Sequence, residues 1–242
     1  NFNSGLLAVH HGGTLTINGE GEIFGVSPGG CVYCGIVLTV DKTDNDSSKP
    51  ARLIVNGGHI VGQCYGISGN GSDASRGNTE CIINGGLIEA SSIIAGEDNC
   101  GYYQPQFNSK MIFNDGVIRG RSAIEIRSGD FTMNGGIAEA YGFANECMIK
   151  NNNGPTSKGV AVAIAQHTTK QPINVIINNG QLIAECPFFE GNPMGNDELS
   201  IATVKAEING GSFRIVGNGI KSFHADNLTE FVKGGEFIHE FT

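Results

Sequence analysis

One short phrase recurs along the chain and constrains its fold more than any other feature. Each copy is an alternating apolar strand, then a turn rich in Asn and Gly, then a second short strand. Asn and Gly both tolerate the left-handed backbone of a tight corner, so each copy predicts two strands joined at a corner. The eight copies begin at Leu15, Leu53, Cys81, Met111, Phe131, Val175, Ala206 and Glu230.

The spacing of the copies predicts a solenoid. The Asn residues of the first seven copies are separated by 38, 28, 30, 20, 44 and 31 residues, which fits coils of three short strands with loop insertions. Coils stacked ~4.8 Å apart share hydrogen bonds along the axis and bury the apolar face that one coil cannot bury alone. We expect an all-β fold, one parallel β-helix of about eight rungs over residues 1–242. Third strands are expected at 36–38, 123–126, 160–164 and 201–204.

The second strands carry an apolar residue at the same inward position in every copy. This column reads Ile23, Ile60, Ile88, Ile118, Ala138, Leu182, Phe213 and Phe237. With these features the chain resembles the pectate-lyase-like right-handed β-helix superfamily. More narrowly, it resembles the Asn-Gly-Gly β-helices of phage fibres and spikes and of bacterial surface carbohydrate-binding proteins. The resemblance spans the whole chain and implies a single-stranded right-handed parallel β-helix.

Charge and apolar content disfavour several classes of protein. The net charge is −9 and the Lys and Arg residues are scattered, so we expect no nucleic-acid partner. No run approaches the ~20 apolar residues of a membrane helix, and no charged leader with an apolar stretch precedes the first turn. The seven Cys residues are irregularly spaced, which predicts free thiols, a reducing compartment, and Cys81 as a small core residue.

A catalytic site is not expected. The resemblance implies hydrolase motifs Asn-Thr-Asp, Asp-Asp, Gly-His and Arg-Ile-Lys in succession, and this set has no match. The best candidate is an outer column of Glu89, Arg119 and Glu139 on successive second strands. Two carboxylates two rungs apart, ~10 Å, fit an inverting glycosidase, whereas alternating charges on neighbouring strands fit a salt-bridge ladder. Because the Arg between the two Glu keeps both ionised, we favour the ladder.

Two further groups of residues resemble metal sites without completing one. Cys31 and Cys34 lack the second Cys pair or spaced His of a zinc site. The loop at 41–46 has three Asp residues, but neither the central Gly nor the distal Glu of a calcium loop. We therefore expect no metal and no cofactor.

The outside of the solenoid offers two candidate contact surfaces. The outward position of the first strand carries Ile54, Ile82, Ile112 and Ile176. An exposed apolar stripe usually marks an interface, either with another protein or in a homo-oligomer. The alternative is that an insertion, such as 96–109 or 143–158, folds over the stripe. The uncapped first strand at 6–9 is an open edge, which predicts docking of the N-terminal end onto another virion or surface protein.

Aromatic residues in the expected insertions form a candidate sugar-binding surface. Insertions are expected at 27–32, 41–50, 69–79, 96–109, 141–159 and 186–198. The rings there are Tyr102, Tyr103, Phe107, Phe188 and Phe189. These rings either stack on a surface polysaccharide or pin their own loops to the rod.

The sequence thus favours a non-catalytic virion surface protein, such as a head fibre, decoration or spike, acting as a display and attachment rod. The alternative is a bacterial cell-surface carbohydrate-binding module. A polysaccharide lyase or hydrolase is the third interpretation.

Overall fold

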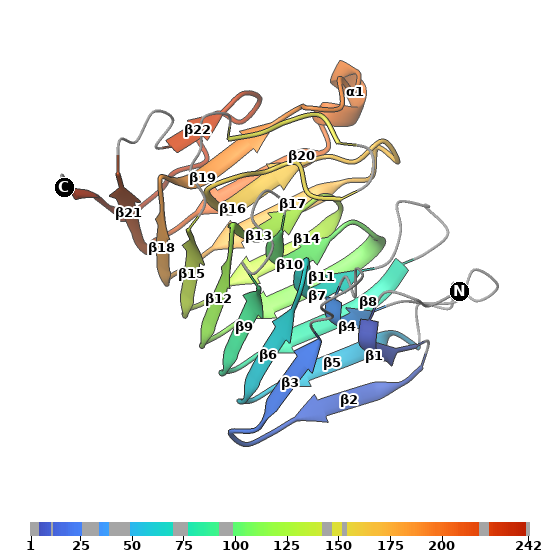
Figure 1. Ribbon diagram of the computed structural model, residues 1–242. Coiled ribbons are helices and arrows are strands. Elements are labelled where there is room, and N and C mark those ends of the chain that lie inside the picture. Colours follow the sequence, from blue (N-terminus) through green and yellow to red (C-terminus); the bar gives the residue numbers. More distant parts are fainter. Residues whose placement is uncertain are drawn as a thin grey trace.

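The structure is a computed structural model whose regular secondary structure is almost entirely β-strand. It describes residues 5–10, 12–25, 34–38, 49–69, 77–91, 99–141, 147–151, 154–217 and 223–240. These residues form parallel strands in three sheets, together with one short helix, α1 (Glu198–Ile201). The all-β, solenoid-like architecture expected from the repeat is therefore confirmed (Figure 1).

The chain visits the three sheets in turn. Sheet A contains β1 (Gly5–Val9), β4 (Cys34–Leu38), β7 (Tyr65–Gly69), β10 (Cys100–Gln104), β13 (Ser122–Ile126), β16 (Val160–Ala165), β19 (Cys186–Gly191) and β22 (Phe223–Ala225). Sheet B contains β2 (Thr14–Ile17), β5 (Ala51–Val55), β8 (Gly77–Ile83), β11 (Phe107–Phe113), β14 (Gly129–Met133), β17 (Ile173–Ile177) and β20 (Val204–Ile208). Sheet C contains β3 (Glu22–Gly25), β6 (His59–Gly62), β9 (Leu87–Ala90), β12 (Val117–Gly120), β15 (Ile137–Ala140), β18 (Gln181–Ala184), β21 (Ser212–Val216) and β23 (Glu236–Glu240).

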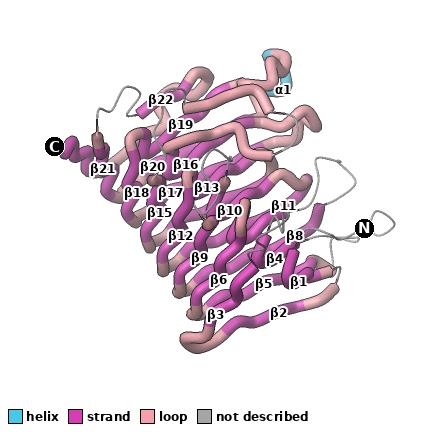
Figure 2. Tube along the Cα trace, in the orientation of Figure 1, coloured by secondary structure: helices cyan, strands magenta, loops and turns pink. Residues whose placement is uncertain are grey.

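Each strand pairs with the equivalent strand of the preceding and following coil. Most neighbours in a sheet are three elements apart along the chain, so the coils stack and the strands run parallel (Figure 2). The inward column of sheet C pairs in the register that the sequence predicts, from Ile23 opposite Ile60 to Phe213 opposite Phe237. Because side chains alternate between the faces of a strand, this register also places the outward columns.

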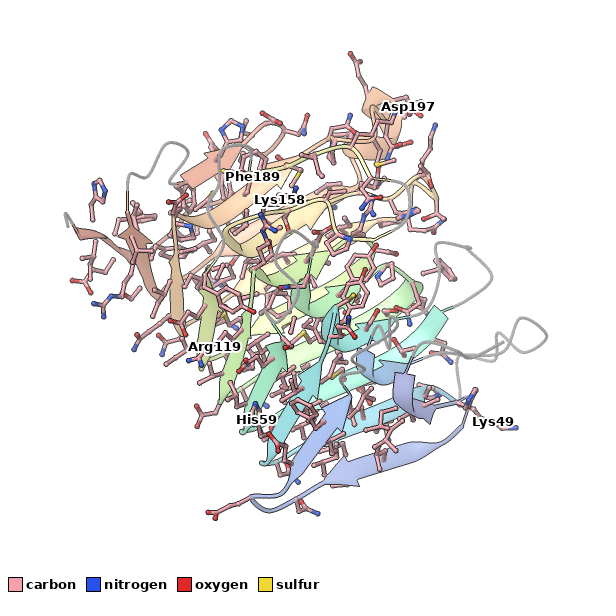
Figure 3. The ribbon with its side chains drawn as sticks, viewed as in Figure 1. Lys49, His59, Arg119, Lys158, Phe189 and Asp197 are labelled. Atoms are coloured by element: carbon pink, nitrogen blue, oxygen red, sulfur yellow. The ribbon has the colours of Figure 1, made fainter. Side chains whose placement is uncertain are left out.

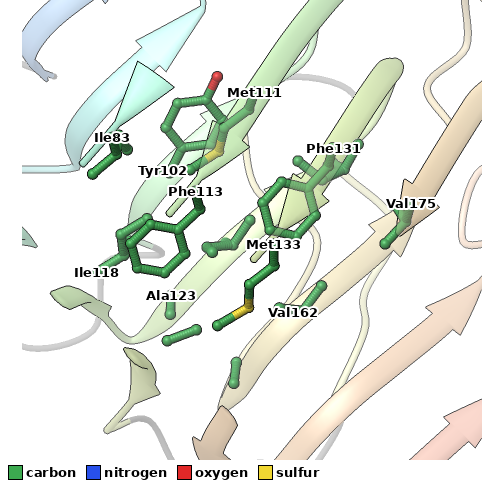
Figure 4. Packing of buried hydrophobic residues seen from close by; sticks show 14 of the residues in the cluster. Ile83, Tyr102, Met111, Phe113, Ile118, Ala123, Phe131, Met133, Val162 and Val175 are labelled. Atoms are coloured by element: carbon green, nitrogen blue, oxygen red, sulfur yellow. The ribbon is translucent and has the colours of Figure 1, made fainter. Parts of the chain in front are cut away.

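The core fills the space between the three sheets. Phe113, Phe131 and Phe213 are fully buried there. Figure 4 shows Phe113, Phe131 and Met133 in this core. Burying one such side chain contributes about 1.5–3 kcal/mol relative to leaving it in water. A continuous core of this kind makes each coil depend on its neighbours.

The corners between sheets B and C hold a ladder of Asn side chains. Six hydrogen bonds of 2.8–3.0 Å join successive side chains, each Nδ2 donating to the Oδ1 of the previous coil, through Asn18, Asn56, Asn84, Asn114, Asn134, Asn178 and Asn209. The corner also requires Gly. Gly86 has a φ of +92°, and a Cβ there would lie 2.7 Å from the carbonyl oxygen of Gly58.

One expected strand is wrong. The sequence predicts a third strand at 201–204, but this segment contains the end of α1 and the start of β20. Asp197 caps the helix by accepting a hydrogen bond from the Ser200 amide, and this local bond favours a helical turn over a strand. The sheet A strand of this coil is β19, which the sequence interpretation assigned to an insertion.

Candidate functional site

Four of the five predicted sugar-binding rings are buried. Tyr102 and Tyr103 lie in β10, Phe188 and Phe189 lie in β19, and none is more than 5% exposed. Their assignment to surface insertions is wrong because both segments are strands of sheet A. A buried ring presents no face to a ligand. Phe107, at the start of β11, is 38% exposed and is the accessible member of the set.

Part of the outer face of sheet A is covered by a segment, here called the covering segment, whose described residues are 147–151 and 154–158. Met148 and Ser157 form an antiparallel bridge within it. Its Cys147 and Met148 pack with Val160, Ala163 and Phe189 of sheet A. Figure 3 labels Lys158 of the covering segment and Phe189.

A buried ion pair fastens the covering segment to sheet A. The Glu125 carboxylate accepts hydrogen bonds of 2.6–2.9 Å from the amides and hydroxyls of Thr156 and Ser157. Arg127 Nε lies 3.8 Å from Glu125 Oε1, and neither side chain has exposed surface. The guanidinium also donates to the Gly154 carbonyl and to the Tyr103 hydroxyl. With these partners the pair is a structural anchor, and it lies away from solvent.

The predicted charge column lies on the outer face of sheet C. Register places Glu89, Arg119 and Glu139 opposite one another on β9, β12 and β15. An Arg119 Nη atom is 2.9 Å from Glu139 Oε2, and the other is 4.0 Å from Glu89 Oε2 (Figure 3 labels Arg119). Both carboxylates thus face one guanidinium. The column therefore has the geometry of a salt-bridge ladder, with a guanidinium between the two carboxylates where a glycosidase would need room for the sugar.

The predicted isoleucines line up on the outer face of sheet B. Register places Ile54 opposite Ile82, and Ile82 opposite Ile112, while Thr132 separates Ile112 from Ile176. We call this row, with Thr132, the isoleucine column; its members are half-buried. The covering segment contacts sheet A, so its described residues do not cover this column.

An open groove of about 670 Å³ runs along the edge where the chain enters sheet B. Its wall follows four successive strands, β11, β14, β17 and β20. It is lined by Phe107, Asn108, Ser128, Gly129, Asp130, Gln171, Pro172, Ile173, Asn174, Ala202, Thr203 and Lys205. Of the residues that sequence reasoning singled out for binding, the groove contains Phe107.

The groove lining leaves no room for a side chain at Gly129. Gly129 has a φ of +79°, and a Cβ on it would lie 2.1 Å from the carbonyl oxygen of Ser109. β14 therefore approaches β11 more closely than any residue with a side chain allows. The Phe107 carbonyl makes a similar close approach to Gly77 on the preceding strand, so no side chain at 77 stands over Phe107.

Besides the Phe107 ring, the groove contains a row of three polar side chains, one acidic, one neutral and one basic. Asp130, Asn174 and Lys205 are exposed and lie opposite one another on β14, β17 and β20. Ser128 is fully buried in the wall, and its hydroxyl has no hydrogen-bond partner within the described part of the chain. Such a site offers donors and acceptors beside an apolar face, which suits a neutral, hydroxyl-rich ligand.

Sequence reasoning missed this polar row, although its signal was present. Asp130, Asn174 and Lys205 each lie two residues before the outward position of the isoleucine column, and side chains two apart share one face of a strand. What the sequence did not show is that these three face the same groove as Phe107.

Thiol and metal chemistry receive no support from the described residues. Five free cysteines are described and all are buried, which confirms the prediction for Cys81. Burial raises the pKa of the Cys81 and Cys100 thiols, and a protonated thiol is a poor nucleophile. No cluster of three His, Cys, Asp or Glu residues suited to a metal occurs in the described ranges. Cys31 and the loop at 41–46 lie outside them.

Comparisons with protein-family models, with curated proteins and with solved structures found no match for this chain. Within the described residues, no helix has the length and apolar character needed to cross a membrane.

Proposed function

We propose that this chain is a non-catalytic attachment rod that binds a neutral polysaccharide in the groove along sheet B. The observation that carries the proposal is the exposed Phe107 ring beside the polar row of Asp130, Asn174 and Lys205. A sugar presents an apolar ring face and several hydroxyl groups, and this groove offers a counterpart for each. Four strands at ~4.8 Å spacing give a binding length of ~14 Å, which is that of a short oligosaccharide.

We further propose that the solenoid is a right-handed single-chain parallel β-helix of about eight rungs, of the Asn-Gly-Gly type. The eight strands in each of sheets A and C support the count. Parallel strands joined through a crossover are nearly always connected in the right-handed sense.

The setting we favour is a virion surface, as a head fibre, decoration or spike protein. We base this setting on the resemblance to the Asn-Gly-Gly β-helices of phage fibres and spikes, on the free thiols, and on the exposed apolar side chains of the first coil. There Leu6 and Leu7 of β1 and Phe24 of β3 are 52%, 38% and 51% exposed. We propose that this end docks onto a neighbouring virion or surface protein.

A bacterial cell-surface carbohydrate-binding module is the second candidate, and the same groove favours it. A glycosidase is disfavoured because such enzymes use a pair of carboxyl groups. Among the described residues lining the groove, Asp130 is the one carboxylate.

The binding proposal is tested on an array of neutral and acidic polysaccharides, followed by titration calorimetry with the best neutral binder. Phe107→Ala should weaken binding about tenfold or more, since covering one aromatic ring contributes about 1.5–3 kcal/mol and 1.4 kcal/mol is a factor of ten. Phe24→Ala is the matched control, because it removes a ring that is even more exposed, but from sheet C. Binding to no neutral glycan, or equal affinities for both variants, would refute the proposal.

A further inference from the structure

The outward side chains of sheet B form three parallel columns. The isoleucine column is the middle one, and the Asn ladder borders it at the corner with sheet C. On the other side, register aligns Arg52, Glu80, Lys110 and Asp130. The charges of this third column therefore alternate in sign over β5, β8, β11 and β14.

A column of four alternating charges is complementary to its own reversed copy. Reversal about a two-fold axis parallel to the strands, between β8 and β11, sets Glu80 opposite Lys110 of the second copy. It also sets Arg52 opposite Asp130 of the second copy. All four cross-pairs then join opposite charges.

The other two columns match under the same operation. The axis sets Ile82 opposite Ile112 of the second copy, and Ile54 opposite Thr132. In the Asn ladder it sets Asn84 opposite Asn114. One symmetry operation thus pairs opposite charges, the two central isoleucines and the Asn amides, as an isologous interface requires.

We propose that the outer face of sheet B is the interface of an antiparallel homodimer, with its two-fold axis between β8 and β11. The half-buried isoleucines supply the apolar centre and the flanking charge column supplies register and orientation. The complementarity requires a second copy of this chain, because it depends on the column meeting its own reversed order.

The contact area between the two copies predicts a weak dimer. The overlap runs from β2 to β17, six strands ~4.8 Å apart with about five residues of ~3.3 Å each, or roughly 500 Å² per copy. Stable complexes bury about 800 Å² per partner, so association should depend strongly on concentration. β20 lies beyond the overlap, so Lys205 stays outside the interface. Asp130 and Asn174 lie within the overlap and also line the groove, so dimerisation and polysaccharide binding compete for these two residues.

Sedimentation equilibrium tests the proposal, with loading concentrations from about 5 to about 500 µM because an interface of this size associates weakly. The native chain should shift from 25.4 kDa toward twice that mass. Glu80→Lys and Lys110→Glu should each raise the dissociation constant at least tenfold, because each reversal creates two like-charge contacts per dimer. The double variant Glu80→Lys/Lys110→Glu should restore association, because the swapped charges meet again across the axis.

Glu139→Lys is the control, since it also reverses one charge of an ion pair, but on sheet C. It should dimerise like the native chain. A native chain that stays monomeric or forms trimers overturns the proposal. So does a dimer that either single reversal leaves intact, or one that the double variant fails to restore while its thermal unfolding remains native-like.

Discussion

The Asn114 side chain donates to Asn84 Oδ1 and accepts from Asn134 Nδ2, at 2.8 and 2.9 Å. Each internal member of the ladder therefore makes two side-chain bonds, whereas Asn18 at its end makes one. The ladder is exposed, so its contribution to stability is a sum of modest hydrogen bonds and not of buried ones.

Because internal Asn residues make two ladder bonds and Asn18 makes one, removing an internal Asn should destabilise the protein more than removing Asn18. Asn114→Ala should lower the free energy of unfolding by about 1–2 kcal/mol, and Asn18→Ala by about half as much, because one bond is lost in place of two. Urea unfolding followed by circular dichroism measures both. Equal losses in the two variants would show that water replaces the ladder bonds without cost.

Neutralising the buried Glu125 should destabilise the protein far more than neutralising the partly exposed Glu89. Glu125→Gln leaves Arg127 buried without its counter-charge and places an NH₂ group against donors from Thr156 and Ser157. We expect a loss of about 3–5 kcal/mol and faster protease cleavage within 147–158. Glu89→Gln, in the partly exposed charge column on sheet C, should cost less than about 1 kcal/mol. Similar losses for both variants would contradict the anchoring role.

Gly129 should tolerate no side chain, for two separable reasons. Gly129→Ala combines a positive φ with a Cβ placed 2.1 Å from the Ser109 carbonyl oxygen. Gly195 also has a positive φ, +68°, but nothing lies within 4 Å of a Cβ there. We expect Gly195→Ala to cost about 1 kcal/mol from backbone strain alone and Gly129→Ala clearly more. Equal melting temperatures would show that β14 can shift away from β11.

Stability should fall in alkali as buried phenols ionise. Burial raises the pKa of Tyr103 to about 12, against about 10 in an unfolded chain. The folded state therefore holds this proton more tightly, so its contribution is complete below pH ~10 and is lost as pH rises toward ~12. Tyr103→Phe should reduce the slope of unfolding free energy between those values by at most about 1.4 kcal/mol per pH unit. Urea unfolding at several pH values measures it, and parallel curves for native and variant would contradict it.

The register of sheet C was predictable from the sequence, but two strands of sheet A were not. A period of two is visible wherever one face of a strand is apolar and the other polar, as from Ile23 to Phe237. β10 and β19 are buried on both faces, because the covering segment and its neighbours close the outer side. Their polar–apolar alternation is lost, so Tyr102 and Phe188 looked like residues of loops.

The repeated Asn-Gly phrase by itself determined the parallel stacked strands, the Asn ladder and the row of outward isoleucines, because each follows from local backbone preference and alternation. Only the tertiary structure decided which side chains meet. It buried four of the five candidate rings, and it buried Glu125 and Arg127 beneath the covering segment. It also placed Phe107 and Lys205 in one groove. The physical reason is that coils separated by insertions of unequal length are aligned by strand register, and sequence distance does not report that alignment.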